Sequence, residues 1–230
     1  LENIGKSTDV CFVLSVSTSI PEFESEFLQG RHDLAFMNPY HQVMAFKAQG
    51  YEAMLADTRL LTGILVVAKD SPAKSLGDLQ GATLSFPAPN AFAASLLIRS
   101  ILADQGVSFK ASYVKTHTNV YRSVALGSAK AGGGVNNTLL REPESLRATL
   151  RVLYETPGFR AHPFSAHPRV SSELRAAITK HILQMTSKPE HQNLLNQVQM
   201  PNPAQASHSR DYAPLQKLGI EQFVINENKN

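Results

Sequence analysis

The sequence is poor in cysteine, contains no tryptophan and has no long apolar run. Its one cysteine, Cys11, cannot form a disulfide within the chain, and it excludes a CxxC metal or redox site. Cys11 lies in the apolar stretch VCFVLSV and is expected to be a small, buried strand residue. No stretch approaches the roughly 18 apolar residues of a membrane span. Stability therefore has to come from a packed apolar core.

The sequence also lacks a cluster of basic residues. The 22 Lys and Arg residues and 19 Asp and Glu residues give a formal net charge of +3, and no three basic residues follow one another. A nucleic-acid groove needs a concentrated basic surface, so nucleic acid is not an expected partner. With 43% hydrophobic and 18% charged residues, the chain has an ordinary globular composition. Its 230 residues fit one large domain or two lobes.

Apolar segments with strand character alternate with segments of helical periodicity. The strands are expected in DVCFVLSV, DLAFMN, LLTGILVVAKD, ATLSFP, ASYVKT, KAGGGV and LRVLYET. The helices are expected in SIPEFESEFLQG, NPYHQVMAFKAQG, AFAASLLIRSILADQG, residues 119–126 and SSELRAAITKHILQMTS. The C-terminal part has no regular pattern until LQKLGIEQFV. This alternation predicts an α/β protein with parallel βαβ units.

Two apolar strands, near residues 61–68 and 150–155, bracket a middle block that has its own βαβ pattern. The outer blocks resemble two halves of a second lobe. We therefore predict two doubly wound lobes joined by two crossover strands. Lobe 1 takes residues 1–62 and 156–230, and lobe 2 takes residues 63–155.

Four strand-to-helix turns contain no Asp or Glu. They are MNPYH (37–41), PAPNAF (87–92), THTNVY (116–121) and VNNTL (135–139). A helix N-terminus stabilises negative charge, which acidic side chains commonly supply. An external anion can fill that role here, whereas the alternative is that Asn and Thr only cap their own helices. Four such turns in one chain favour an anion site.

Four stretches of the chain resemble the periplasmic solute-binding proteins of phosphate, phosphite and phosphonate ABC transporters. They are GRHDLAFMNPYHQVMA, FPAPNAFAASLLIRSIL, YVKTHTNVYRSVALGSAKAGGGVNNTL and DYAPLQKLGIEQFV. The resemblance extends from Asp9 to Val224, and TH-x-N-V-Y and AGGGVN are its most specific parts. It implies a type II periplasmic-binding-protein fold whose two lobes hold the ligand and close by hinge motion. It also implies one further strand and helix before Leu1, so the sequence is expected to start late in the fold.

The expected ligand contacts lie in the four turns. The resemblance implies Tyr40, the phosphonate cradle around Asn90, the anion-binding turn at His117 and Asn119, and the position of Asn136. Tyr121 adds a phenolic donor or a stacking surface. The predicted ligand-binding residues are Tyr40, Asn90, Ala91, Ala93, Ser95, His117, Asn119, Tyr121 and Asn136.

Two departures from the family pattern bear on the ligand. The hydroxyl groups of the cradle are replaced by NAFAA, which leaves backbone N–H groups, the Asn90 amide and Ser95. Asn136 stands where aminophosphonate binders can carry an acid, and an amide cannot neutralise an ammonium group. The expected ligand is therefore a small oxyanion without an amine.

Three other patterns in the sequence do not indicate a nucleotide or metal site. Gly132, Gly133 and Gly134 have no Lys or Ser in P-loop spacing, so close backbone approach is favoured over phosphate binding. His162 and His167 lack an accompanying metal motif, and no metal or cofactor is expected. Arg99 and Arg122 can pair with acids or reach the ligand, and the pattern leaves their direction open.

These observations favour a non-catalytic solute-binding protein that captures phosphate, phosphite or a phosphonate for ABC import. No Ser-His-Asp, Cys-His or paired-carboxylate pattern is visible, so an enzyme is not expected. There are three alternatives. The chain can be an extracytoplasmic sensor domain, an enzyme on the same fold that resembles the thiamine-pyrimidine synthases, or an interaction module that has lost ligand binding. We expect a periplasmic or extracytoplasmic monomer, compatible with a lipid anchor, whose partner is an ABC permease or a membrane signalling module.

Overall fold

The computed structural model describes residues 1–225 and divides the chain into two compact units. Unit 1 comprises Leu1–Leu60 and Arg160–Lys217, and unit 2 comprises Leu61–Phe159 and the chain from Leu218 onward. The chain thus passes between the units three times. The last passage differs from the predicted division, which placed the whole C-terminal part in lobe 1.

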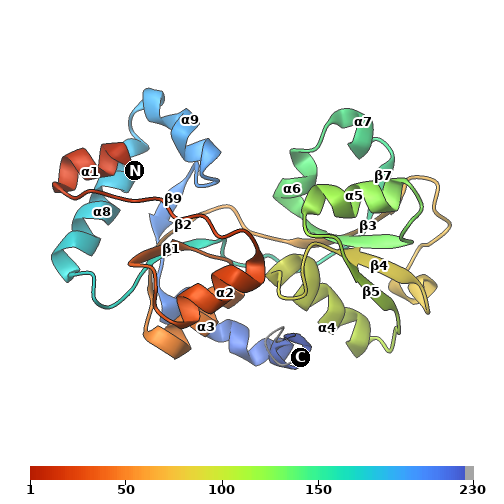
Figure 1. Ribbon diagram of the computed structural model, residues 1–230. Helices are drawn as coiled ribbons and strands as arrows, with labels where there is room; N and C mark the ends of the chain where they lie inside the picture. Colours follow the sequence, from red (N-terminus) through yellow and green to blue (C-terminus); the bar gives the residue numbers. More distant parts are fainter. Residues whose placement is uncertain (226–230) are drawn as a thin grey trace. The chain divides into compact units, whose positions relative to one another are not determined.

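Unit 2 is built on a five-stranded mixed sheet (Figure 1). The strand order is β5-β4-β6-β3-β7. The strands are β3 (Gly63–Ala68), β4 (Thr83–Phe86), β5 (Lys110–Tyr113), β6 (Ala131–Val135) and β7 (Leu150–Glu155). Strand β4 runs parallel to both β5 and β6, whereas β3 runs antiparallel to β6 and β7. The carboxyl ends of β4, β5 and β6 consequently lie at the same edge of the sheet.

Helices α4 (Leu97–Asp104) and α5 (His117–Ala125) cover opposite faces of this sheet (Figure 1). The side chains of strand β3 point alternately to the two covered faces of the sheet. Leu65 and Val67 pack in one core cluster with Leu102 of α4, and Ile64 and Val66 pack in another with Val120 of α5. Both faces of β3 are buried, as the continuous apolar sequence GILVVA indicates.

The three glycines of β6 allow its neighbours to approach the strand closely. A methyl group on Gly132 would overlap Val120, one on Gly133 would overlap the carbonyl oxygen of Ala94, and one on Gly134 would overlap the Tyr121 hydroxyl. The prediction that neighbouring atoms approach the backbone of Gly132, Gly133 and Gly134 closely is confirmed. The glycines let α5 and the helix start at residue 92 lie directly on the strand.

Unit 1 contains a four-stranded sheet in the order β1-β8-β2-β9. The strands are β1 (Leu34–Phe36), β2 (Glu52–Asp57), β8 (Pro163–Ala166) and β9 (Pro203–Gln205). All neighbouring pairs are antiparallel, so β1 and β2 point the same way with β8 between them. Strands β2, β8 and β9 were not predicted from the sequence. The expectation of parallel βαβ pairing is wrong for this unit.

Helices again cover both faces of the unit 1 sheet (Figure 1). One face packs against α1 (Glu2–Thr8), α8 (Ser172–Met185) and α9 (Pro189–Gln197), and the other against α2 (Ile20–Leu28) and α3 (Pro39–Gln49). Helix α8 buries Ile178, Ile182 and Met185, and the helix predicted in SSELRAAITKHILQMTS is confirmed. Within residues 1–225, no helix has the length and apolar character to cross a bilayer.

Helix α3 begins and ends where the sequence predicts. The Asn38 side chain accepts a hydrogen bond from the His41 backbone N–H at 2.8 Å, and Pro39 occupies the first turn. Gly50 ends the helix in the left-handed conformation, with φ 74°. Local capping therefore fixes both ends of this helix.

The predicted N-terminal strand is absent. Residues 9–16 contain no strand, Cys11 is exposed, and Val13 and Val16 are largely exposed. Among the described residues, no strand pairs with this stretch. Its β-branched composition favours a strand, but a strand also requires a hydrogen-bonded neighbour. The expectation that Cys11 is buried is therefore wrong.

Candidate functional site

Three of the predicted ligand turns lie together at the carboxyl edge of unit 2. We use this name for residues 87–95, 114–121 and 136–138, which comprise the turns after β4, β5 and β6 and the helix starts that follow them. Because these strands are parallel, their ends meet on one side of the sheet. Each turn leads into a helix, so first-turn N–H groups gather at this edge. The fourth turn, with Tyr40, lies in unit 1.

The 87–91 turn enters a π-helical turn, η2 (Phe92–Leu96), that continues directly into α4. Ala91 and Ala93 are buried at its start, and Ser95 is fully buried. The Ser95 hydroxyl has no hydrogen-bond partner within the described part of the chain. A single π-helical turn in a helix is frequent at functional sites. This turn thus places a buried hydroxyl without a partner among the described residues in the first turn of a helix.

The Asn90 side chain is committed to the C-terminal segment. Its Nδ2 donates to the Ile225 carbonyl oxygen, and its Oδ1 accepts from the Ile225 N–H, both at 3.0 Å. Arg99 donates from Nη1 to the Pro89 carbonyl at 3.1 Å, so its guanidinium supports the turn from α4. The amide of Asn90 and the direction of Arg99 are thus set by contacts within unit 2.

The start of α5 holds His117 and Asn119. Thr116 caps the helix by accepting from the Asn119 N–H at 3.1 Å, and the Asn119 Nδ2 donates to the Val114 carbonyl at 2.9 Å. The Nδ1 atom of His117 is buried and has no hydrogen-bond partner within residues 1–225. Burial, with a smaller contribution from the positive charge of Arg141, lowers the pKa of His117 to about 4. The imidazole is therefore neutral at pH 7.

An acid lies near this turn although the turn contains none. The Thr118 hydroxyl donates to Glu142 Oε1 at 2.6 Å. Glu142 and Arg141 both follow the short helix α6 (Asn136–Leu140), so opposite charges approach the start of α5 together. No local pattern signals either residue, since both are brought here by the packing of α6 on α5.

Tyr121 connects α5 to the start of α6, and Asn136 is hydrogen-bonded within the start of α6 and to Thr62. The Tyr121 hydroxyl is 2.6 Å from the Thr138 Oγ1 and 3.3 Å from the Val135 carbonyl oxygen. Burial raises the pKa of Tyr121 to about 12. Asn136 accepts at Oδ1 from its neighbour Asn137 at 2.9 Å. Both side chains hold the carboxyl edge together, and Thr138 was not foreseen from the sequence.

Acid titration tests the burial of His117. A histidine with a folded pKa of about 4 and an ordinary value of 6.5 stays neutral in the folded protein while it becomes protonated in the unfolded chain. Its contribution to the free energy of unfolding is therefore complete above pH 6.5 and is lost as the pH falls towards 4. We expect His117→Gln to remove about 2 kcal/mol of the stability loss between pH 7 and pH 5. Urea unfolding of both proteins at the two pH values measures this, and equal losses would contradict it.

In unit 1, Tyr40 lies buried in the first turn of α3. The adjacent His41 ring contacts Glu24 of α2, with 2.9 Å between Nε2 and Oε1. Arg122, whose direction was left open, is exposed on α5. The predicted ligand residues other than Tyr40 thus share the carboxyl edge of unit 2.

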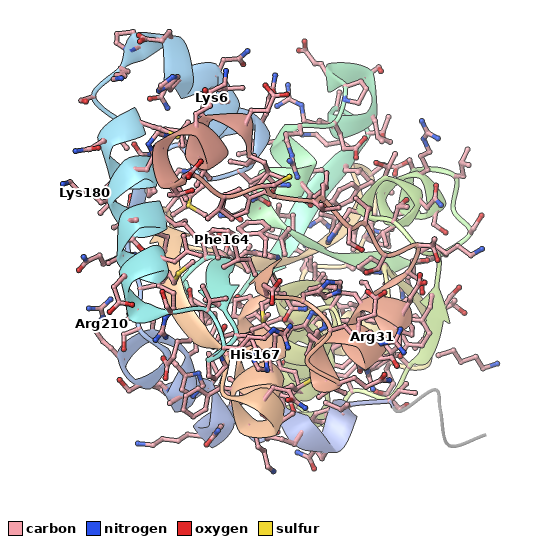
Figure 2. All side chains as sticks on the ribbon, turned by 60° about the vertical axis from the view of Figure 1, so that its left-hand side comes forward. Lys6, Arg31, Phe164, His167, Lys180 and Arg210 are labelled. Carbon is pink, nitrogen blue, oxygen red and sulfur yellow. The ribbon has the colours of Figure 1, made fainter. Side chains whose placement is uncertain are left out.

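A separate groove in unit 1 contains none of the predicted residues. It lies between α8 and β2 and is lined by Glu52, Arg175 and Lys180 among others. Lys180 is labelled on α8 in Figure 2. Burial raises the pKa of Glu52, while the charge of Arg175 opposes that rise. No group of three or more metal-binding side chains is found in the part of the chain that the structure describes.

Known structures share this fold at low sequence identity. PhnD1 from Prochlorococcus marinus in complex with methylphosphonate has a TM-score of 0.84 at 18% identity, covering 97% of this chain and 90% of that one. A binding protein of an ABC phosphonate transporter from Pseudomonas aeruginosa gives 0.82 at 14%, covering 97% and 80%. XAC2383 from Xanthomonas citri bound to ATP gives 0.81 at 17%, covering 97% and 91%. At these identities the likeness establishes the fold, which confirms the predicted fold class.

The sequence also matches a family model. No curated protein sequence is significantly similar to the chain. The model of the periplasmic substrate-binding proteins of phosphonate ABC transporters, however, matches residues 1–212. This is a family of non-catalytic, periplasmic binding proteins, as the sequence predicts. The chain belongs to the phosphonate-type periplasmic substrate-binding proteins of ABC transporters.

Proposed function

We propose that this protein captures a small tetrahedral oxyanion, namely phosphate, phosphite or a simple alkylphosphonate, for delivery to an ABC permease. The carboxyl edge of unit 2 supplies the main contacts. Three buried side-chain groups at the helix starts of that edge have no hydrogen-bond partner among the described residues: the Ser95 hydroxyl, His117 Nδ1 and Asn137 Oδ1. The first two support the proposal most directly, whereas Asn137 Oδ1 can only accept a hydrogen bond. An anion oxygen can accept from the first-turn N–H groups and from the hydroxyl.

The contacts we propose are the backbone at Ala91 and Ala93, the Ser95 hydroxyl, and the side chains of His117 and Asn119. Tyr40 of unit 1 remains a predicted contact. Tyr121 is hydrogen-bonded to Thr138 of α6 and Asn136 to its neighbour Asn137, so we propose that they shape the edge. No carboxylate from the first turns repels an anion, although Glu142 limits the space beside Thr118. A compact anion fits these donors better than a larger ligand.

The ligand class does not follow from the fold. Relatives of the same fold are described with methylphosphonate and with ATP. The ammonium group of an aminoalkylphosphonate would need a carboxylate partner, and Asn136 offers an amide in the predicted position. We therefore place phosphate, phosphite and methylphosphonate before aminoalkylphosphonates. The protein is expected to act as a monomer.

A thermal-shift screen tests the proposal. A ligand at one hundred times its dissociation constant adds about 2.7 kcal/mol of stability, which raises the unfolding midpoint measurably. We expect an increase with phosphate, phosphite or methylphosphonate and a smaller one with sulfate or acetate. If none of these anions raises the midpoint, the proposed ligand class is wrong.

The double variant His117→Ala/Asn119→Ala is expected to abolish that increase, because it removes the side-chain contacts at the start of α5. A matched control is His191→Ala/Asn193→Ala, which makes the same changes at the same spacing on α9 of unit 1. The control is expected to keep the full ligand-dependent increase. An undiminished increase in the first variant would remove the His117 turn from the site.

A further inference from the structure

The last described residues form a separate strap on unit 2. We call Leu218–Ile225 the C-terminal strap; it includes the 3₁₀ turn η5 (Ile220–Phe223). The chain enters it directly from unit 1 at Lys217. Ile220 is fully buried, and η5 packs against α4. The strap is thus an integral part of the unit that carries the proposed anion site.

The strap is attached to the 87–91 turn directly at Asn90 and, through Arg99 of α4, at Pro89. The Asn90 amide pairs with both the N–H and the carbonyl of Ile225, each at 3.0 Å, as a neighbouring strand would. Asn90 is only 3% exposed and Ile225 is 39% exposed, so the pair is shielded from water on the Asn90 side. Arg99 lies 5.9 Å over the Phe223 ring while it donates to the Pro89 carbonyl. One side of the turn is therefore held by the strap.

The turn held in this way leads directly into the proposed anion contacts. Asn90 precedes Ala91, the residue from which η2 starts, and Ser95 donates its backbone N–H to the Ala91 carbonyl at 2.8 Å. A shift of Asn90 therefore changes the direction of the first-turn N–H groups. Fixing the direction of these groups before an anion binds lowers the ordering cost of binding and so raises affinity.

We infer that the C-terminal strap positions the anion-binding turn, and that Asn90 is a positioning residue which acts through Ile225 and not a ligand contact. The effect on affinity rests on the proposed function. The ordering of the turn by the strap does not, because these contacts join residues of this chain alone. The two parts can therefore be tested separately.

Ile225→Pro and Ile225→Ala form a matched pair in the full chain. Proline removes the N–H that Asn90 accepts, whereas alanine removes only the side chain and keeps both backbone bonds. Val224 has φ −69° and ψ 128°, a conformation that a following proline tolerates. We expect amide hydrogen exchange in residues 90–96 of the ligand-free protein to become about three- to tenfold faster in Ile225→Pro, as one lost hydrogen bond allows. Ile225→Ala is expected to leave it unchanged.

Titration with methylphosphonate and with inorganic phosphate then measures affinity. Ile225→Pro and Asn90→Ala are each expected to weaken binding by about three- to tenfold. The double variant is expected to bind no more weakly than the single variant with the larger loss of affinity. If Asn90→Ala abolishes binding while Ile225→Pro leaves it intact, Asn90 contacts the anion and the inference is overturned. Unchanged exchange in Ile225→Pro overturns it as well.

Failure of the proposed function gives a different result. If the wild-type protein binds neither probe but Ile225→Pro still accelerates exchange in residues 90–96, the strap orders the turn and the ligand class is wrong. If the wild-type protein binds and neither strap variant changes exchange or affinity, the site is correct and the strap has no positioning role.

Discussion

Gly133→Ala is expected to lower the free energy of unfolding by about 3 kcal/mol or more. A methyl group at this position would overlap the carbonyl oxygen of Ala94 and the ring of Phe86. The first of these is a backbone atom in η2, so it cannot move away as a flexible side chain would. Strand β6 or η2 must shift instead, and that shift also moves Ala93 and Ser95. Loss of anion binding is expected together with the loss of stability.

Gly77→Ala is the control for that substitution. The nearest atom to a methyl group at Gly77 is the Ser75 hydroxyl oxygen, at an ordinary contact distance of 3.7 Å. We expect a change of at most about 0.5 kcal/mol in urea unfolding and no change in ligand response. Equal stability of the Gly133 variant and the wild-type protein would mean that η2 does not lie against β6 as described.

Gln42→Leu is expected to destabilise the protein by about 3 kcal/mol. Gln42 is fully buried in α3, and its side chain contacts three other segments of unit 1. Its Nε2 donates to the Tyr51 carbonyl at 2.7 Å, and its Oε1 accepts from the Ser165 hydroxyl at 2.6 Å. The same Nε2 lies 3.4 Å from His208 Nδ1. Leucine has a similar volume but leaves these buried polar groups without partners, which is the costly case.

A double-mutant cycle identifies the cause of that loss. Adding Ser165→Ala removes the stranded hydroxyl, so the double variant is expected to be less destabilised than the sum of the two single variants. Gln184→Leu makes the same change at an exposed position of α8 and is expected to have little effect. Additive effects in the cycle would show that the Gln42–Ser165 hydrogen bond contributes nothing of its own.

Much of the secondary structure follows from local sequence. Asn38, Thr116 and Ser171 accept hydrogen bonds at the starts of α3, α5 and α8, within three residues along the chain. Such caps depend on neighbours in sequence, so their helices are predictable. Strand β3 is predictable because a strand buried on both faces has a continuous apolar sequence.

The strands that were predicted wrongly or missed depend on pairing partners far away in the sequence. Residues 9–16 have strand composition and form no strand, whereas Glu52–Asp57 form a central strand of unit 1 between β8 and β9. Whether a segment pairs is decided by what lies beside it, and β9 is about 150 residues further along the chain. The short strands β8 and β9 carry too few residues for a periodic signal.

The sequence by itself determined the family, the fold class, the ends of the capped helices and the acid-free turns, because these depend on residue types and on neighbours along the chain. Only the tertiary structure decided how the site residues are used. It brought Asn90 to Ile225, 135 residues away, joined Tyr121 to Thr138, and buried His117 so that its pKa falls to about 4. The physical reason is that hydrogen-bond partners and burial are properties of packing, and packing joins segments that no local pattern connects.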